Sequence, residues 1–256
     1  MHASQKAARF ERRWDKKVIM KSTATFVATA ILGLSGAAHA VTVNGSQFTN
    51  GLSNQTISGV SFSAIGGNFE KKAAGPVTGV GISSTTSGEI DIDGEAIRAS
   101  FAALGAQHVS SFTLGLLYNG PEYNDVLEVA KVTVNGNQNY YLKATATEDV
   151  AQWFKGNTLL GNVNYTYGTQ AGVGAVVKVN NPFGNLAVTS VKFSAIAGVD
   201  LDRCGKYGRS DCTNQSDYNL VQLATAPIPE PGTYAMLLAG LMAVGFVVRR
   251  RSDIRG

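Results

Sequence analysis

Apolar residues recur at every second position in one short segment after another, and this pattern limits the fold of the chain more than any other feature. Successive side chains of a β-strand point to opposite faces, so such alternation is typical of a strand with one buried face. We therefore expect an all-β domain. The alternating segments are residues 41–43, 57–65, 77–82, 89–92, 97–101, 112–117, 126–134, 140–146, 163–167, 173–179 and 188–195.

Turn residues separate these segments where a hairpin would need them. Asn135-Gly136 stands between two alternating runs, and Asn-Gly is the strongest short hairpin signal. Residues 180–185 carry a longer loop of the same kind, which predicts a second hairpin. Only residues 149–154 look helical. Short strands with almost no helix predict that residues 41–226 form a single antiparallel β-sandwich or jelly-roll-like domain.

The N-terminus has the three parts of a secretory signal peptide. Basic residues up to Lys21 precede an apolar stretch at residues 23–34, and Ala38-His39-Ala40 supplies the small residues that signal peptidase requires. We expect cleavage after Ala40, which makes residues 1–40 the signal peptide. Met20 is an alternative start, because the segment that it begins has the length of an ordinary signal peptide.

The C-terminus combines a proline motif, an apolar run and a basic cluster. Pro229, Glu230 and Pro231 come first, and both prolines keep the backbone extended and without amide donors. The apolar residues 234–248 are fewer than the roughly 20 that a permanent membrane span uses. Behind them stand Arg249, Arg250 and Arg251, which favour the cytoplasmic side of a membrane.

This tail resembles the PEP-CTERM sorting signal of Gram-negative bacteria, over residues 228–251 only. The resemblance implies that an exosortase, a membrane enzyme, recognises and removes the tail at residues 227–256, whose transmembrane helix at 234–248 is a transient inner-membrane anchor. It also implies release to the cell envelope or extracellular matrix, where similar proteins are associated with exopolysaccharide and biofilm. An ordinary permanent C-terminal anchor is the alternative.

Net charge argues against a nucleic-acid partner. Residues 41–228 carry eleven Lys and Arg against fourteen Asp and Glu, a formal net charge of −3, so the basic pI of the whole chain comes from its two ends. Binding of nucleic acid depends on cations that neutralise phosphates. We therefore expect no nucleic-acid partner for the mature domain.

Cys204 and Cys212 are the only cysteines, and both belong to the exported part. An oxidising compartment favours a disulfide between them, which would close a small loop near the end of the domain. A two-cysteine metal site is the alternative. It has no evident partner, because His108 is the only histidine between residues 41 and 228.

The usual catalytic motifs are missing from the sequence. It contains no Gly-x-Ser-x-Gly elbow and no His-Glu-x-x-His zinc motif, and His108 has no evident catalytic partner. We therefore expect a non-catalytic protein. A pair of carboxylates, as in a glycosidase, is the alternative that survives. Its candidates are Glu89, Asp91, Asp93, Glu95, Glu122, Asp125 and Glu128.

Residues 88–95 are a candidate calcium site. Glu89, Asp91 and Asp93 alternate with two isoleucines, so a strand here would bury the isoleucines and align three carboxylates on the other face. Hard oxygen ligands of this kind suit Ca²⁺. The alternative is a solvated strand face that ends in a turn. No other cofactor is expected.

Residues 118–125 are a candidate carbohydrate-binding loop. Tyrosine rings offer apolar faces to sugar C–H groups, and amides and carboxylates can bind hydroxyls. The alternative is a turn whose tyrosines pack on the edge of the sandwich, and Trp153 is expected in the core. The candidate residues are Tyr118, Asn119, Glu122, Tyr123 and Asp125.

These observations predict a secreted envelope or matrix protein that is processed by signal peptidase and an exosortase. Its expected partner is extracellular polysaccharide, or further copies of itself. The alternative function is a polysaccharide-active enzyme that uses a carboxylate pair.

Overall fold

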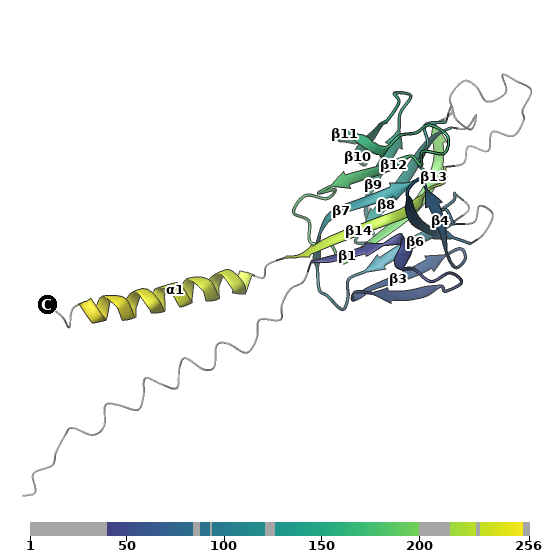
Figure 1. Cartoon of the computed structure of the whole chain (residues 1–256). Coiled ribbons are helices and arrows are strands. Elements are labelled where there is room, and N and C mark those ends of the chain that lie inside the picture. The colour runs from purple at the N-terminus through teal and green to yellow at the C-terminus, as the bar shows by residue number, and fades with distance from the viewer. Residues whose placement is uncertain are drawn as a thin grey trace, which may run out of the picture. The chain divides into compact units, whose positions relative to one another are not determined.

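The computed structural model of the chain describes residues 40–83, 88–92, 94–120, 126–199, 216–228 and 231–252 (Figure 1). The predicted signal peptide, up to residue 39, lies outside the described residues. So do Cys204 and Cys212, whose disulfide stays a prediction.

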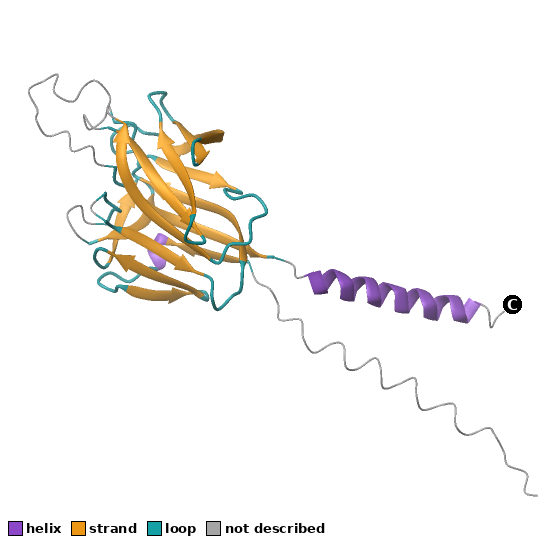
Figure 2. Ribbon diagram, turned by 180° about the vertical axis from the view of Figure 1, so that it is seen from behind, coloured by secondary structure: helices purple, strands orange, loops and turns teal. Residues whose placement is uncertain are grey.

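The described chain consists of antiparallel strands, one short 3-10 helix and one α-helix (Figure 2). This confirms the all-β prediction. The strands are β1 (Val41–Asn44), β2 (Asn54–Ile57), β3 (Val60–Ile65), β4 (Phe69–Ala74), β5 (Val77–Ile82), β6 (Ala96–Ser100), β7 (Gln107–Gly115), β8 (Leu127–Val134), β9 (Gln138–Ala144), β10 (Val150–Lys155), β11 (Thr158–Tyr167), β12 (Val176–Asn180), β13 (Ser190–Val199) and β14 (Asn219–Pro227); the 3-10 helix is η1 (Gly45–Gln47).

The strands form two sheets that share β11. Sheet I has the order β4-β5-β14-β7-β12-β11, with β1 also paired to β14. Sheet II has the order β2-β3-β6-β13-β8-β9-β10-β11. Because β11 pairs with β10 on one side and with β12 on the other, the two sheets are continuous along one edge.

Aromatic contacts show that the two sheets pack face to face. Phe112 on β7 of sheet I touches Phe193 on β13 and Trp153 on β10, both of sheet II, with ring centroids 5.5 Å and 5.4 Å apart. Phe48 contacts Phe62 at the other end, at 4.9 Å. Edge-to-face contacts of this kind add to the hydrophobic burial of each ring. The main core therefore lies between the two sheets, and Trp153 lies in it as expected.

The Asn-Gly hairpin is confirmed. Asn135 and Gly136 have φ values of 52° and 81°, in the left-handed region that Asn and Gly tolerate best, and they connect β8 to β9. The Asn135 side chain also ties this turn to the start of β13, because its Oδ1 accepts the Thr189 N–H at 2.8 Å and its Nδ2 donates to the Ala187 carbonyl at 2.9 Å.

The predicted helix at residues 149–154 is wrong, because this segment is strand β10. Ala151 and Trp153 face the core while Gln152 and Phe154 point outward, and β10 pairs with β9 and β11. Apolar residues at 150, 151, 153 and 154 suit the helical and the strand periods alike. Pairing with a neighbour on each side settles the conformation as a strand.

Two further strand predictions need correction. Residues 57–65 are not one strand, because Ser58 and Gly59, with φ values of 50° and 83°, form the turn between β2 and β3. Residues 89–92 do not form a strand either: Glu89 and Ile90 make only isolated bridges, to Ile82 and Tyr218.

The hairpin predicted at residues 180–185 is also wrong. β12, before this loop, pairs with β7 and β11, whereas β13, after it, pairs with β6 and β8. The loop carries the chain from sheet I to sheet II instead of reversing it within one sheet. Phe183 in the loop is buried in the shared core, which accounts for this path.

The tail contains the helix α1 (Pro231–Ser252), which includes the predicted helix at 234–248. Proline suits the first position of a helix, because its missing N–H would have no partner there. Its side chains from 235 to 245 are exposed. Within the described part of the chain, no helix combines the length and the apolar character that crossing a membrane requires.

Candidate functional site

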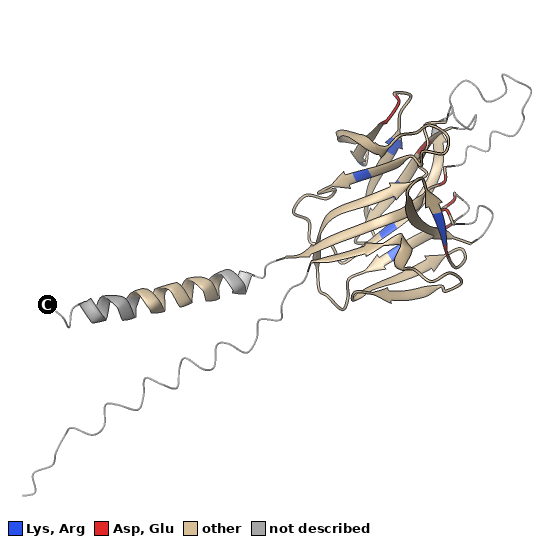
Figure 3. Ribbon diagram, in the orientation of Figure 1, with Lys and Arg blue, Asp and Glu red and all other residues tan. Residues whose placement is uncertain are grey.

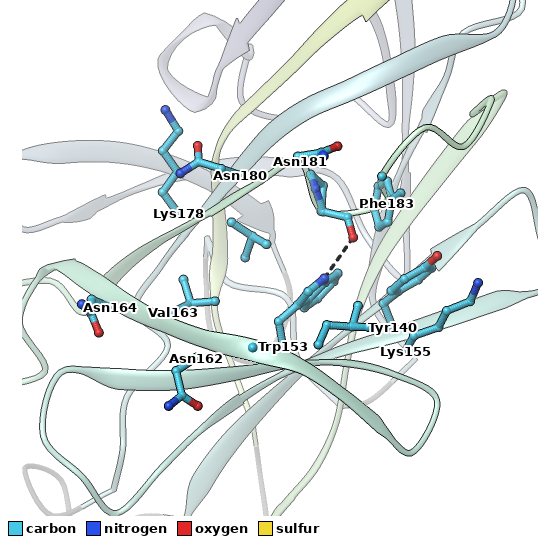
Figure 4. A pocket seen from close by; sticks show the side chains of 15 residues that line it. Tyr140, Trp153, Lys155, Asn162, Val163, Asn164, Lys178, Asn180, Asn181 and Phe183 are labelled. Atoms are coloured by element: carbon cyan, nitrogen blue, oxygen red, sulfur yellow. Dashed lines mark hydrogen bonds between the residues drawn. The ribbon is translucent and has the colours of Figure 1, made fainter.

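A groove of about 640 Å³ lies where β11 and β12 diverge (Figure 4). The two strands pair only at Tyr165 and Tyr167 of β11, and a register shift separates these two residues. Residues 158–164 of β11, which precede Tyr165 in the chain, are not paired with β12. They form one wall of the groove, and residues 178–180 of β12 form the opposite wall. This volume is in the range of small-molecule sites.

The floor of the groove is a cluster of three aromatic rings. Tyr140 stacks on Trp153, with centroids 5.4 Å apart and planes 12° from parallel, and the Phe183 ring meets Tyr140 at 4.9 Å. Trp153 Nε1 donates a hydrogen bond to the Pro182 carbonyl at 3.0 Å. Because all three rings are buried and fixed by their neighbours, the floor is apolar and rigid.

Asparagines from both walls lie at the rim of the groove. Asn162 and Asn164 come from β11, where their side chains point to the face opposite Val163 and Trp153, and Asn180 and Asn181 come from the end of β12 and the loop after it. Asn162 Oδ1 accepts a bond from Gln152 at 3.4 Å. Each amide offers two donors and an acceptor, so these borders can bind hydroxyl groups.

His108 positions one of these amides. Its Nε2 lies 2.9 Å from Asn181 Oδ1, and the Asn181 backbone N–H donates to the Ser110 carbonyl at 2.7 Å. Asn181 itself has a φ of 44°. The sequence identified His108 as an isolated histidine, and in the structure it supports the end of β12 beside the groove.

Backbone groups add to the polar wall. Among the described strands, β10 is the only neighbour of β11 along residues 158–164, so half of the peptide groups there face away from any paired strand. An unpaired strand edge presents N–H donors and C=O acceptors at regular intervals. The wall therefore offers hydrogen bonds from main chain and side chain together.

The charged residues of the groove are lysines. Lys155 and Lys178 border it, and no Asp or Glu is among the described residues that line it. Lys155 Nζ lies 5.7 Å from the centre of the Tyr140 ring. Hydrolysis of a glycosidic bond normally uses two carboxyl groups on either side of that bond.

The predicted carbohydrate loop is partly described and differs from the groove. Tyr118 and Asn119 are only 8% and 4% exposed, and Tyr118 packs in a small second core with Leu116 and Val176. The Tyr118 N–H donates to the Glu128 carboxylate, which holds the start of the loop against β8. Tyr118 is not among the described residues that line the groove. Glu122, Tyr123 and Asp125 lie outside the described residues.

The predicted calcium ligands are not on a solvated strand face. Glu89 is buried and forms an ion pair with Lys72 at 2.9 Å, and burial raises the pKa of Glu89 above its ordinary value although Lys72 lowers it. Asp91 is also buried, and its Oδ1 accepts the Ile92 N–H at 2.6 Å. Asp93 lies outside the described residues.

Within the described residues, no three Asp, Glu, His or Cys side chains are grouped as metal ligands would be. The calcium site stays a prediction. Of the sorting residues, Pro229 and Glu230 lie outside the described part, whereas Pro231 begins α1 and Arg249, Arg250 and Arg251 lie near its end.

Sequence reasoning missed the groove. Two features of the sequence could have indicated it. They are Asn162 and Asn164, which alternate along one strand, and the Asn180-Asn181 pair at the end of another. Neither signal shows that the two segments face each other, because this depends on β11 leaving sheet I after two pairs.

Comparison with known families identifies only the tail. The family described as PEP-CTERM protein-sorting motif matches residues 227–251. No curated protein and no solved structure matches the chain. The match confirms the resemblance found at the C-terminus, and it indicates export and transient anchoring in the membrane through the tail. The chain therefore carries the sorting motif of a secreted protein that an exosortase targets.

Proposed function

We propose that the β-sandwich is the delivered part of this protein and that it binds extracellular polysaccharide in the groove between β11 and β12. The observation that carries this proposal is the combination of a rigid aromatic floor with asparagines at the rim of both walls. A sugar has apolar C–H faces and many hydroxyl groups, and it needs both kinds of surface.

The proposal agrees with delivery by the sorting tail. A secreted protein released from the membrane meets the polysaccharide outside the cell, and a groove that opens at the edge of a sandwich can accept part of a long chain. Self-association is the alternative occupant, because the unpaired edge of β11 could also bind a strand of a second copy.

Binding of the exported, processed protein to the producing bacterium's neutral extracellular polysaccharide tests the proposal. Replacing Asn162, Asn164 and Asn180 by Ala removes hydrogen bonds worth about 0.5–1.5 kcal/mol each, so we expect affinity to fall by roughly tenfold or more. The matched control is Asn54→Ala, an exposed amide on β2 at the far end of sheet II. Equal affinities of the two variants would reject the groove.

Polysaccharide cleavage is the second candidate, and one observation favours it. Glu89 is a buried carboxyl whose pKa is raised by desolvation, a property found in general acids. Release of new reducing ends from the polysaccharide, lost on Glu89→Gln or Glu122→Gln, would establish an enzyme. Binding without release of reducing ends would support a binding protein.

A further inference from the structure

Four basic side chains gather on the outer face of sheet II. Lys192 on β13 lies directly opposite Arg98 on β6. Lys131 on β8 is paired with Ser194, two residues along β13 from Lys192, and Lys143 on β9 is two residues from Tyr141, the partner of Lys131. We call Arg98, Lys192, Lys131 and Lys143 the basic band.

The alternation of each strand places all four on the same outward face. Their neighbours in the chain point the other way, into the core shared with sheet I. Arg98 is exposed and the three lysines are half-buried by the side chains around them. The core neighbours are Ile97, Ala99, Ala130, Val132, Leu142, Ala144, Val191 and Phe193.

Among the described residues, no carboxylate pairs with the basic band. The ion pair among the described residues joins Lys72 to Glu89, and neither residue lies on the four strands of the basic band. Glu128 is on β8, the strand of Lys131, but it occupies an inward position beside Val129 and is buried. Figure 3 shows blue segments within strands of the domain, and red segments largely in the connecting turns.

Such an arrangement is unfavourable unless an anion binds to it. Like charges directly opposite on paired strands, such as Arg98 and Lys192, destabilise a sheet. The cost is unexpected here, because residues 41–228 carry a net charge of −3 and could supply partners. These four cations therefore lie together on one face, while the rest of residues 41–228 carries an excess of acids.

The band has the dimensions and the chemistry of a polymer site. The band crosses the four adjacent strands β6, β13, β8 and β9. At a spacing of about 4.8 Å between neighbouring strands, its length across the sheet is roughly 14 Å. Hydroxyl side chains of Ser63 and Thr133 occupy the same face, opposite Arg98 and Lys192. Lys143 Nζ also lies 4.6 Å from the centre of the Phe154 ring, which keeps an apolar surface beside the charge.

We propose that this face of sheet II binds an acidic polysaccharide, with carboxylate groups of successive sugars on the basic band and hydroxyls on the neighbouring Ser and Thr. Charge complementarity identifies the partner as anionic, and the alternation of cations with hydroxyl side chains over several strands favours a sugar chain. A duplex nucleic acid would meet an acidic domain, and a membrane surface would find few exposed apolar side chains on this face.

The site is separate from the groove between β11 and β12, so the two proposals can fail independently. The test uses the exported, processed protein with polygalacturonate, a carboxylated polysaccharide, as the probe. Dextran is the neutral probe, and phosphatidylglycerol vesicles and duplex DNA represent the other anionic partners. The band variant is Lys131→Gln with Lys192→Gln, and the control is Lys71→Gln, an exposed lysine outside both the band and the groove.

We expect the native protein to bind polygalacturonate more weakly as salt rises, because salt screens exposed charges. The band variant should lose roughly tenfold or more in affinity for polygalacturonate, and the control variant should lose less than about twofold. Circular dichroism and melting temperature establish that each variant folds. Binding of dextran reports on neutral sugar sites and should be the same in all three proteins.

Three results would overturn the proposal. The first is no saturable binding of polygalacturonate at low salt. The second is equal loss of affinity in the band and the control variants, which would mean that charge acts without a site. The third is tighter binding of vesicles or DNA than of polygalacturonate, which would assign the face to a membrane or a nucleic acid instead.

Discussion

Trp153 on β10 and Pro182 in the loop from β12 to β13 are joined by a hydrogen bond of 3.0 Å from the indole Nε1 to the carbonyl. This bond connects sheet II to the chain segment that crosses between the sheets, at the floor of the groove. The loop keeps its place because the Phe183 ring beside it packs against Tyr140.

Replacing Trp153 by Phe should destabilise the sandwich. The change leaves the Pro182 carbonyl without its indole donor and leaves a space in the aromatic cluster, so the free energy of unfolding should fall by about 2–4 kcal/mol. Urea unfolding followed by circular dichroism measures it. Leu160→Ala, at a side chain that is 51% exposed, is the control and should change stability by less than about 0.5 kcal/mol.

Gly79→Ala should destabilise the domain through a clash. A Cβ at this position would lie 2.0 Å from Asn219 Oδ1, and the Asn219 side chain is fully buried and bonded through Nδ2 to the Lys72 carbonyl. Forced repacking of this kind costs about 1–3 kcal/mol. The control is Gly161→Ala on β11, where a Cβ meets nothing within 4 Å. A melting temperature as low for the control as for Gly79→Ala would contradict this account.

Glu89 should make the domain less stable as pH rises. Burial raises the pKa of Glu89 in the folded protein above 4.5, its ordinary value, so the folded state binds the proton more tightly than the unfolded chain. This contribution is fully present below the unfolded pKa and is lost as pH rises through the folded pKa.

Glu89→Gln removes the titrating group and keeps an acceptor for Lys72. The stability of the native protein relative to this variant should therefore fall as pH rises above about 4.5, the ordinary pKa of a Glu. Melting temperatures of both proteins over this range measure the difference, in which the other titrating groups cancel. Parallel curves would show that Glu89 has the same pKa in the folded and the unfolded chain.

Local sequence patterns are sufficient to predict a strand where its apolar residues alternate regularly and a tight turn connects it to the next strand. β8, Asn135-Gly136 and β9 follow from the sequence because the turn and both strands make the same prediction. β14 was missed, because its register shifts between Leu220 and Gln222 and it buries Leu220, Val221 and Leu223 on two different sides. A bulge of this kind breaks the period of two.

The groove and the basic band depend on contacts between distant parts of the chain. Arg98 and Lys192 are far apart in the sequence and meet only because β6 pairs with β13. Strand order cannot be read from alternation, so neither site could be predicted. The sorting tail is different, because its proline motif, apolar run and arginines are consecutive in the chain.

The mass of the intact protein isolated from outside the producing bacterium tests most directly whether the tail is temporary and the sandwich is the delivered part. We expect a C-terminus near Pro229, Glu230 and Pro231, without the residues of α1 that follow the cut. A mature protein that still contains Arg249, Arg250 and Arg251 would contradict it and would indicate a permanent anchor.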